Sequence, residues 1–308
     1  IDACLSDDAI AKWIREDNVD ILIDLDGHRP GNRISVFMHR AAPIQVSWMG
    51  YAGTTGLKEM DFIISDEFAI PKGEMKFYCE SPLLLPNGSF FGRLSKNDSE
   101  PESISNALPQ TVNGFVTFGC LNPVACVSPN VIQVWSQILS SVSNSQLLIA
   151  NQSCLDSTVR ARLSRSFAEF GIDDSRLNFF GIHPDEDAQS AIEKIDVYLD
   201  TFPYAGAGQI WDVLFAGVPV VAKSGAGIRG RSSHSILSSL GLSYLSVMGN
   251  DGYVELAVEL ANNVERLRSL KIQLPEKAAG SPNCDPRKFT LKLEDALQDA
   301  WQRYCKKS

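Results

Sequence analysis

The sequence has no long apolar run and no excess of basic residues. None of its apolar segments approaches the roughly 18–20 residues that a helix needs to cross a bilayer, so we expect no membrane partner. Its 28 Lys and Arg residues are outnumbered by 37 Asp and Glu residues, which gives a formal net charge of −9. Because a general nucleic-acid binder needs clustered basic residues to displace counterions, we also expect no nucleic-acid partner. A phosphate-bearing small ligand needs only local donors and stays possible.

Paired cysteines and metal-ligand clusters are lacking as well. The seven cysteines are odd in number, scattered and free of C-x-x-C pairs: Cys4, Cys79, Cys120, Cys126, Cys154, Cys284 and Cys305. This pattern argues against a disulfide framework and against a zinc ribbon. No cluster of His, Cys and carboxylate residues has the spacing of a metal site, so we expect neither a metal nor a cofactor.

The beginning of the chain lacks the features of a secretory signal. It starts at Ile1, without an initiator Met, a basic segment or an apolar segment. Together with the cysteine pattern, this predicts a cytoplasmic location. We also expect the chain to be a fragment or a processed form.

Short β-branched runs alternate with amphipathic stretches along two segments of the sequence. In the first segment, residues 7–16 predict a helix and residues 21–25, 44–48 and 62–64 predict strands. In the second, strands are predicted at residues 115–120, 146–150, 177–180, 197–199 and 218–222, and helices at residues 128–141, 158–170, 185–194, 210–216 and 232–240. Continuous apolar strands separated by helices of about ten residues imply parallel sheets covered on both faces.

Two further segments set the expected domain boundaries. Residues 95–113 are rich in Ser, Pro, Asn and Glu, which is typical of a linker, and residues 286–304 predict a final helix that begins near Pro286. We therefore expect an α/β protein with one domain over residues 1–105 and a second over residues 106–285. The final helix, residues 286–308, is expected to pack across the junction of the two domains.

In open α/β folds, ligands bind beyond the carboxyl ends of the strands, so the loops after strands are the candidates for chemistry. The first such loop, residues 24–31, offers Asp26 as a carboxylate and His28 as a group that titrates near neutrality. Gly27 and Gly31 would let the backbone approach a ligand. The alternative is an ordinary turn in which the Asp caps a helix and the His has no role.

The second loop, residues 48–56, contains three glycines and two threonines. Gly50, Gly53, Thr54 and Thr55 could present N–H and hydroxyl donors to a sugar or a phosphate. The loop matches neither the Walker A motif nor the dinucleotide fingerprint. It could equally be a tight turn before the strand at residue 62.

The third region follows the strand that ends at Asp200. A turn containing Gly206 and Gly208 leads into a helix that is expected to begin near Gln209, and the N-terminus of such a helix favours an anion. Asp212, expected in the first turn of this helix, could accept hydrogen bonds from a ribose or could merely complement the helix dipole.

Three other candidates follow later strands. Arg229 and Arg231 lie in a predicted loop, where either could meet a pyrophosphate or simply face solvent. His183 follows the strand at residues 177–180 and is expected to lie at the cleft, where it could contact a ligand or have no role. His39 and His234 are expected to be structural.

Five segments together carry a family resemblance. Residues 20–33 (DILIDLDGHRPGNR), 40–56 (RAAPIQVSWMGYAGTTG), 60–71 (MDFIISDEFAIP), 200–204 (DTFPY) and 212–221 (DVLFAGVPVV) resemble glycosyltransferase family 41, which includes O-GlcNAc transferase and SPINDLY. The resemblance covers essentially the whole chain. It implies a GT-B fold, in which two Rossmann-like domains face a cleft and the first of them is incomplete in this chain. It also implies an inverting, metal-independent transfer. The donor would be a UDP- or GDP-sugar carrying GlcNAc, Glc or Fuc, and the acceptor a Ser, Thr or Asn of a protein or peptide.

The loops and the resemblance together define the expected site residues. His28 is the best candidate for a catalytic base, although it could instead only bind the sugar. The expected nucleotide-sugar-binding residues are Gly50, Tyr51, Gly53, Thr54, Thr55, Asn122, His183, Gly206, Gly208, Asp212 and Arg231.

The chain departs from the family pattern on the diphosphate side of the expected site. Cys126 stands where O-GlcNAc transferases have a lysine that contacts the diphosphate, and Asp185 and Ala188 stand where the animal enzymes have a lysine and a histidine. Residues 207–209 (Ala-Gly-Gln) replace a hydroxyl-rich turn. Each lost charge-assisted hydrogen bond is worth about 1.5–3 kcal/mol, which Lys223 or Arg231 could partly restore.

These departures leave three hypotheses. The chain could be an active glycosyltransferase with altered donor contacts. It could be a catalytically degenerate GT-B domain that binds proteins without turnover. It could also be a related GT-B enzyme that uses another nucleotide sugar or a non-protein acceptor.

Overall fold

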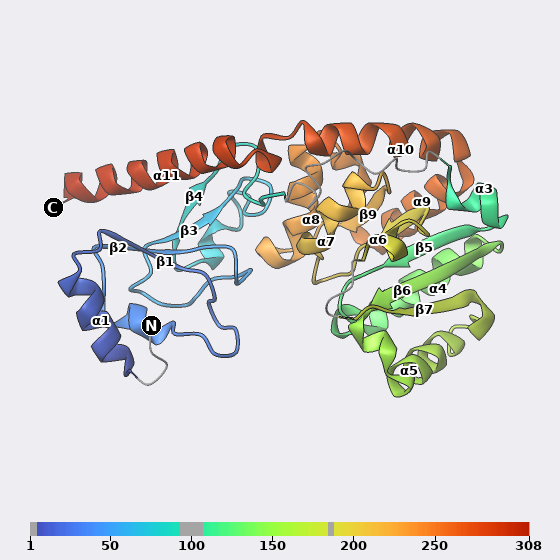
Figure 1. Cartoon of the computed structure of the whole chain (residues 1–308), viewed down its shortest axis with the longest axis horizontal. Helices are drawn as coiled ribbons and strands as arrows, with labels where there is room; N and C mark the ends of the chain where they lie inside the picture. Colours follow the sequence, from blue (N-terminus) through green and yellow to red (C-terminus); the bar gives the residue numbers. More distant parts are fainter. Residues whose placement is uncertain (1–4, 93–106, 184–187, 308) are drawn as a thin grey trace. The chain divides into compact units, whose positions relative to one another are not determined.

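The computed structural model describes residues 5–92, 107–183 and 188–307. The chain forms two α/β units (Figure 1). The first unit comprises Ile1–Phe91, Ala226–Arg229 and Asp285–Ser308, and the second comprises Gly92–Gly225 and Gly230–Cys284. Within the described residues, no helix is both long and apolar enough to cross a membrane.

The first unit is built on a four-stranded parallel sheet in the order β1-β2-β3-β4. The strands are β1 Ile21–Asp24, β2 Ile44–Ser47, β3 Phe62–Ser65 and β4 Ser81–Leu84, and the helices are α1 Asp7–Glu16, α2 Ser35–Met38 and α11 Pro286–Lys307. Ser6 starts α1 because its hydroxyl accepts a hydrogen bond from the backbone N–H of Ala9.

Helices cover both faces of this sheet. On one face, Ile44, Val46 and Leu83 pack against Phe289 and Ala300 of α11, and Figure 1 shows α11 lying alongside the strands. On the other face, a cluster that includes residues of α1 and α2 packs with Leu22 of β1. The side chains next to Leu22 in β1 point to the opposite face, because side chains alternate along a strand. Both faces of the sheet are therefore buried, as expected for parallel strands.

The second unit contains a six-stranded parallel sheet in the order β10-β9-β8-β5-β6-β7. The strands are β5 Val116–Cys120, β6 Ser145–Asn151, β7 Leu177–Gly181, β8 Val197–Leu199, β9 Val220–Lys223 and β10 Ser246–Val247. The helices are α3 Pro109–Asn113, α4 Pro129–Ser141, α5 Ser157–Ala168, α6 Gln189–Ile192, α7 Ala207–Phe215, α8 Gly227–Ser239, α9 Gly249–Asn262 and α10 Val264–Ala279. Strand order reverses between β5 and β8, and such a switch point is where open α/β sheets bind ligands.

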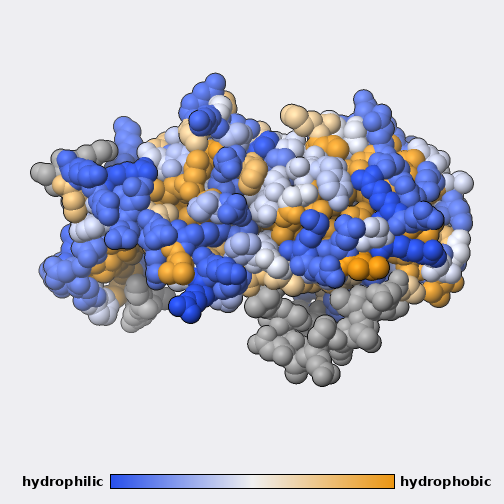
Figure 2. All heavy atoms as spheres, turned by 90° about the horizontal axis from the view of Figure 1, so that it is seen from above, coloured by the Kyte–Doolittle hydropathy of each residue, from blue (hydrophilic) through white to orange (hydrophobic). Residues whose placement is uncertain are grey.

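Short 3-10 turns connect several of these elements: η1 Met75–Phe77, η2 Val124–Cys126, η3 Gln152–Leu155, η4 Asp174–Arg176, η5 Ser243–Leu245 and η6 Pro282–Cys284. On the face shown in Figure 2, hydrophobic residues are interspersed among hydrophilic ones. Scattered apolar side chains of this kind are normal on a protein surface.

The sequence predicts most of these elements within a few residues, and the structure corrects it at several places. Strands β4 and β10 are missing from the prediction, and so are helices α2, α9 and α10. Helix α3 occupies part of the predicted linker, of which residues 95–106 lie outside the described residues. The prediction of a loop around Arg229 and Arg231 is wrong, because both residues lie in helix α8.

Candidate functional site

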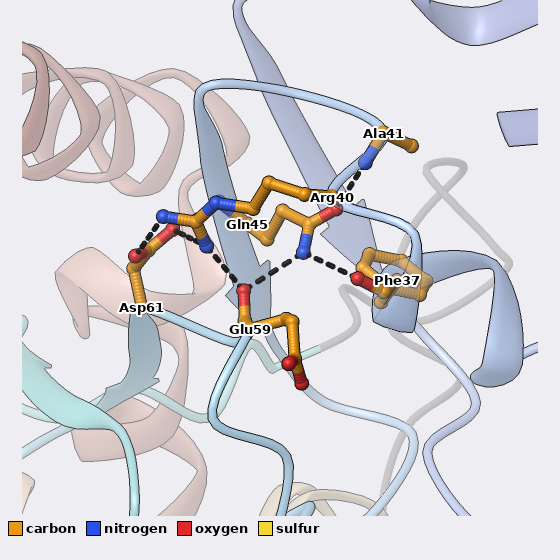
Figure 3. Close-up of polar contacts among 6 residues, drawn as sticks. All are labelled: Phe37, Arg40, Ala41, Gln45, Glu59 and Asp61. Atoms are coloured by element: carbon orange, nitrogen blue, oxygen red, sulfur yellow. Dashed lines mark hydrogen bonds and ion pairs between the residues drawn. The ribbon is translucent and has the colours of Figure 1, made fainter. Parts of the chain in front are cut away.

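Residues 40–45, the start of the segment 40–56 that carries part of the family resemblance, form a turn that a buried glutamine holds together (Figure 3). The side chain of Gln45 is inaccessible to solvent. Its Nε2 donates to the carbonyl oxygens of Phe37 and Glu59, each at 2.8 Å, and its Oε1 accepts from the backbone N–H of Ala41 at 3.0 Å. Every polar atom of this amide is satisfied, which fixes the path of the chain into β2.

An ion pair completes this turn. Arg40, which has a positive φ of 52°, binds Asp61 in a bidentate manner, with Nη2 to Oδ1 at 2.7 Å and Nη1 to Oδ2 at 2.9 Å. The same Oδ2 accepts the backbone N–H of Gln45 at 2.9 Å. Arg40, Gln45 and Asp61 thus have a structural role and orient β2 for the loop that follows it (Figure 3).

The first candidate loop begins with a buried carboxyl at the end of β1. Asp24 accepts the backbone N–H of Asp26 at 3.2 Å and that of Gly27 at 2.9 Å. Burial raises the pKa of the Asp24 carboxyl, and the two backbone hydrogen bonds oppose that shift. Asp24, and not Asp26, therefore holds the turn that places His28.

Glycines let the first loop approach the second. Gly27 has a φ of +53°, and a Cβ added there would lie 2.3 Å from Cβ of Tyr51. A Cβ added to Gly50 would lie 1.5 Å from the carbonyl oxygen of Leu25. The structure consequently brings His28 and the loop of residues 50–56 together at the carboxyl ends of β1 and β2.

Aromatic and polar contacts join the two loops. The ring of Tyr51 meets that of His28 edge-on, with centroids 5.2 Å apart, and the guanidinium carbon of Arg229 lies 5.9 Å from the Tyr51 centroid. His28 Nε2 lies 2.7 Å from the carbonyl oxygen of Thr55. Because a carbonyl oxygen can only accept, Nε2 carries the proton, and Nδ1 of the neutral ring is left as an acceptor.

The two threonine hydroxyls of the second loop are bound within the protein. Thr54 Oγ1 donates to Glu80 Oε2 at 2.7 Å, and the Thr55 hydroxyl and backbone N–H both donate to Glu80 Oε1, the latter at 2.6 Å. Glu80 is only 2% exposed. These hydroxyls hold the second loop, so the groups that the two loops can offer to a ligand are the backbone of the second loop, the Tyr51 ring and the His28 imidazole. A Cβ added to Gly53 would lie 3.2 Å from Cε1 of Tyr51.

In the second unit, Asn122 and Asp200 meet at the switch point of the sheet. Asn122, which follows β5, donates from Nδ2 to Asp200 Oδ1 at 2.9 Å and to Thr201 Oγ1 at 2.6 Å, and its Oδ1 accepts from the Tyr198 hydroxyl at 3.0 Å. Burial raises the pKa of the Asp200 carboxyl to about 6, against the effect of the surrounding donors. This network fixes the loop between β8 and α7.

The same network reaches the N-terminus of α7. Gly206 donates its backbone N–H to Asp200 Oδ1 at 2.9 Å. It is the N-cap residue of α7 and, as a glycine, has no side chain to cap the helix. Gly208 is exposed, with nothing within 4 Å of an added Cβ. The helix begins at Ala207, so Asp212 lies in its second turn. The prediction that Asp212 lies in the first turn is therefore wrong. Its side chain is exposed.

Two residues predicted to contact phosphate, Arg231 and Lys223, have partners inside the second unit. Arg231 Nη1 donates to Ser224 Oγ at 2.8 Å. Lys223 Nζ donates to Asn250 Oδ1 at 2.6 Å and lies 4.4 Å from the ring centroid of Phe202. Burial lowers the pKa of Lys223. Both cations are thus positioned at the carboxyl end of β9.

The remaining residues of interest lie after β5 and β7. His183 is exposed and follows Ile182, whose backbone N–H donates to the Asn151 carbonyl at 3.3 Å. Asn151 Nδ2 in turn donates to the carbonyl of Asn122 at 3.1 Å, so the ends of β5, β6 and β7 are joined. Asp185 lies outside the described residues, and Ala188 precedes α6.

Cys126 lies in η2, and its side chain is half-buried. Burial raises the pKa of its thiol, and the nearby Asp200 carboxylate raises it further. The side chain is therefore a neutral thiol near pH 7 and supplies no positive charge. Across the residues that the structure describes, no group of three or more His, Cys, Asp or Glu side chains is placed to hold a metal ion.

Comparison with known proteins decides the family. The model of the family described as Glycosyl transferase family 41 matches residues 3–97 and 105–293. The chain belongs to this family. A family 41 relative from Eustoma exaltatum subsp. russellianum, named as a probable UDP-N-acetylglucosamine–peptide N-acetylglucosaminyltransferase SPINDLY, is 38% identical over 298 residues. The alignment covers 96% of this chain and 32% of the relative, so the chain spans about a third of that protein's length.

Solved structures support the same assignment. A mutant O-GlcNAc transferase from Thermobaculum terrenum superposes with a TM-score of 0.84 and 30% identity, over 98% of this chain and 57% of that chain. HepE from Anabaena in complex with UDP superposes with a TM-score of 0.61 over 94% of this chain and 82% of that chain. At 10% identity, HepE shows the fold alone. With its two Rossmann-like parallel sheets, this family 41 chain has a GT-B fold.

Proposed function

We propose that the protein transfers a sugar from a nucleotide diphosphate sugar to a Ser, Thr or Asn side chain of a protein or peptide. Membership of glycosyltransferase family 41 supports this proposal, and so does the name of the SPINDLY relative, which specifies a UDP-GlcNAc donor and a peptide acceptor. The proposed donor is a UDP- or GDP-sugar that carries GlcNAc, Glc or Fuc. We further propose that the transfer inverts the anomeric centre and needs no metal, on the family resemblance described above.

The observation that carries the proposal is the uncapped N-terminus of α7. It lies next to the switch point between β5 and β8, where Asn122 and Asp200 fix the preceding loop. Because the N-cap residue Gly206 has no side chain to cap this terminus, its N–H groups and the helix dipole can bind an anion. In the proposed reaction, this terminus stabilises the charge that develops on the diphosphate leaving group.

His28 is the proposed base on the acceptor side. Its Nε2–H donates to the Thr55 carbonyl, so the Nδ1 lone pair is the atom that can accept a proton from an acceptor hydroxyl. The acceptor oxygen or nitrogen would then bond to the anomeric carbon as the bond from that carbon to the diphosphate breaks. Attack from the face opposite the diphosphate inverts the centre.

A thermal-shift titration tests donor binding. The full protein is heated with increasing UDP, GDP and the corresponding sugars, up to millimolar concentration, because a ligand that binds the folded state raises the melting temperature. Stabilisation by one nucleotide and its sugar supports the proposal. Absence of any shift with all of these ligands overturns it.

A second function is favoured by the chemistry at Cys126. The neutral thiol there and the hydroxyl-free residues 207–209 remove groups that would stabilise a leaving diphosphate. A GT-B domain that binds proteins without turnover would show nucleotide binding without release of sugar from any donor. Measuring hydrolysis and transfer with the same protein separates the two functions.

The proposed location is the cytoplasm. Among the described residues, all six cysteines carry free thiols, which suits a reducing compartment. Fractionation of cells that express the full protein would check this location.

A further inference from the structure

Glu80 is a buried carboxylate that the proposed function leaves without a role. It immediately precedes β4, is 2% exposed and belongs to neither candidate loop. All three of its hydrogen bonds are donated by Thr54 and Thr55. Because each partner is a donor, Glu80 acts only as an acceptor, as an ionised carboxylate does.

These contacts continue into a hydrogen-bonded chain that ends at His28. The Thr54 hydroxyl donates to Glu80 Oε2 at 2.7 Å, and Thr54 Oγ1 accepts the backbone N–H of Gly56 at 3.2 Å. That N–H belongs to the peptide group between Thr55 and Gly56. The carbonyl of the same peptide group accepts Nε2–H of His28 at 2.7 Å.

The Glu80 carboxylate sets the direction of the hydroxyl bond in this chain, and the two backbone groups set the direction of the others. Because the carboxylate can only accept, the Thr54 hydroxyl must point its proton at Glu80 and its lone pairs at the Gly56 N–H. Hydrogen bonds that run in one direction through a peptide group polarise one another, so the Thr55 carbonyl becomes a stronger acceptor. A stronger acceptor opposite Nε2 of His28 keeps the proton on that nitrogen and leaves Nδ1 available to accept a proton.

We propose that Glu80 is a positioning residue for His28, acting through the Thr54 hydroxyl and the Thr55–Gly56 peptide group. The chain would fix both the ring orientation and the tautomer of His28. That His28 is the base rests on the proposed function, whereas the chain itself can be tested without any substrate.

Other charged groups near His28 act independently of this chain. Asp24 lies on the same loop, and its charge interacts with His28. Asp26 pairs with Arg29 at 3.9 Å on the exposed side of that loop, and Arg229 lies over the Tyr51 ring that meets His28. All of these groups remain in the variants below, so a change in His28 reports on the chain from Glu80.

The first measurement is the ring N–H signal of His28 in proton–nitrogen NMR spectra. The sequence has four histidines, so the signal can be assigned from its loss in His28→Gln. In the unmodified protein we expect a slowly exchanging Nε2–H signal, because that proton is hydrogen-bonded. We expect Glu80→Gln to abolish the signal, since the amide places donors against the threonine donors.

Asp66→Asn is the matched control. Asp66 is another buried carboxylate of the first unit, and it accepts backbone N–H bonds from Phe68, Ala69 and Ser89. Its replacement should lower stability as Glu80→Gln does while leaving the His28 signal in place. Loss of the signal in Asp66→Asn as well would show general loosening of the unit and would overturn the proposal.

Thr54→Val provides a milder second variant, because it keeps the side-chain shape and removes only the hydroxyl. We expect it to abolish the His28 signal, and the double variant with Glu80→Gln to do no more. If the signal persists in Thr54→Val, or is absent from the unmodified protein, the proposal is wrong.

Kinetics give the second readout. A general base contributes about 10²–10⁴-fold to a rate, so we expect Glu80→Gln to lower kcat by at least about tenfold while KM for the donor changes less than about twofold. An equal rise in KM with kcat unchanged would contradict a positioning role. If the unmodified protein transfers no sugar, the proposed function fails, and the NMR comparison still decides whether Glu80 positions His28.

Discussion

Gly206 lies directly against Asn122: a Cβ at position 206 would lie 1.9 Å from Oδ1 of the asparagine. Asn122 cannot easily move away, because Tyr198, Asp200 and Thr201 all hold its side-chain amide. Two expected site residues, more than 80 positions apart in the sequence, are thus fitted to each other at the switch point of the second sheet.

This fit predicts that Gly206→Ala destabilises the protein. Overpacking in a fixed environment costs about 1–3 kcal/mol, and displacement of the loop should also weaken nucleotide binding at the α7 terminus. Melting temperature with and without UDP measures both effects. Gly208→Ala is the control for stability, since nothing lies within 4 Å of its added Cβ. Equal melting temperatures for the two variants would contradict the close fit.

The buried carboxyl of Asp196 predicts a pH dependence of stability. It accepts the backbone N–H groups of Gln110 and Thr117 at 3.0 and 2.9 Å, and burial raises its pKa from 3.8 to about 6. At a pH between 3.8 and about 6, Asp196 is protonated to a greater extent in the folded state than in the unfolded state. The contribution of Asp196 to stability is therefore largest below about pH 4 and falls as the pH rises to about 6.

Asp196→Asn isolates this contribution, because the amide does not titrate. The free energy of unfolding of the unmodified protein, relative to that of the variant, should fall by at most about 3 kcal/mol between pH 4 and pH 7. Denaturant titrations at several pH values measure the difference. A difference that stays constant or grows with pH would contradict the raised pKa.

The turn around Gln45 predicts a large loss of stability in Gln45→Leu. The substitution removes the acceptor of the Ala41 N–H. It also removes one donor from each of the carbonyls of Phe37 and Glu59, which keep a bond from Arg40. A buried group left unsatisfied costs about 1–3 kcal/mol, and each lost hydrogen bond about 0.5–1.5 kcal/mol, so we expect a loss of about 2 kcal/mol or more by chemical denaturation.

Arg29→Ala serves as the control for this prediction. Arg29 forms an exposed pair with Asp26 at 3.9 Å, and surface pairs of this kind contribute about 0–1 kcal/mol. If Gln45→Leu were as mild as Arg29→Ala, the family-specific block would not have the structural role assigned to it.

We expect a cation at position 126, introduced by Cys126→Lys, to tighten nucleotide binding. A charge-assisted hydrogen bond to a diphosphate is worth about 1.5–3 kcal/mol, so Cys126→Lys should lower the Kd for UDP by about tenfold or more. Calorimetric titration measures the change, and Cys126→Met controls for side-chain size. If the lysine variant binds no better than the methionine variant, the neutral thiol is not what limits binding.

The sequence predicts much of this fold because its central strands are continuous apolar runs. Residues 21–25 and 197–199 show this pattern, and the structure places β1 and β8 there within one residue. Strand β4 was missed because its sequence, Ser-Pro-Leu-Leu, contains a proline and shows no clear alternation. Helix α10 was missed in part because Pro275 lies inside it.

The missed start of α8 has a non-local cause. Its glycine-rich beginning is typical of a loop, but the N–H groups of Gly227 and Ile228 donate to Glu74 and to the Tyr78 hydroxyl, about 150 residues away in the sequence. Local pattern carries no information about such partners. Glu80 could not be found for the same reason, since its role depends on three contacts made across at least 25 positions.

The most direct test of the account is a transfer assay with the full protein, candidate UDP- and GDP-sugars and a protein extract as acceptor, read by mass spectrometry. We expect the mass of one sugar on Ser, Thr or Asn side chains, release of the nucleoside diphosphate, and a transfer rate that is lower by about 10²-fold or more in His28→Gln. Nucleotide binding without sugar transfer from any donor would contradict it.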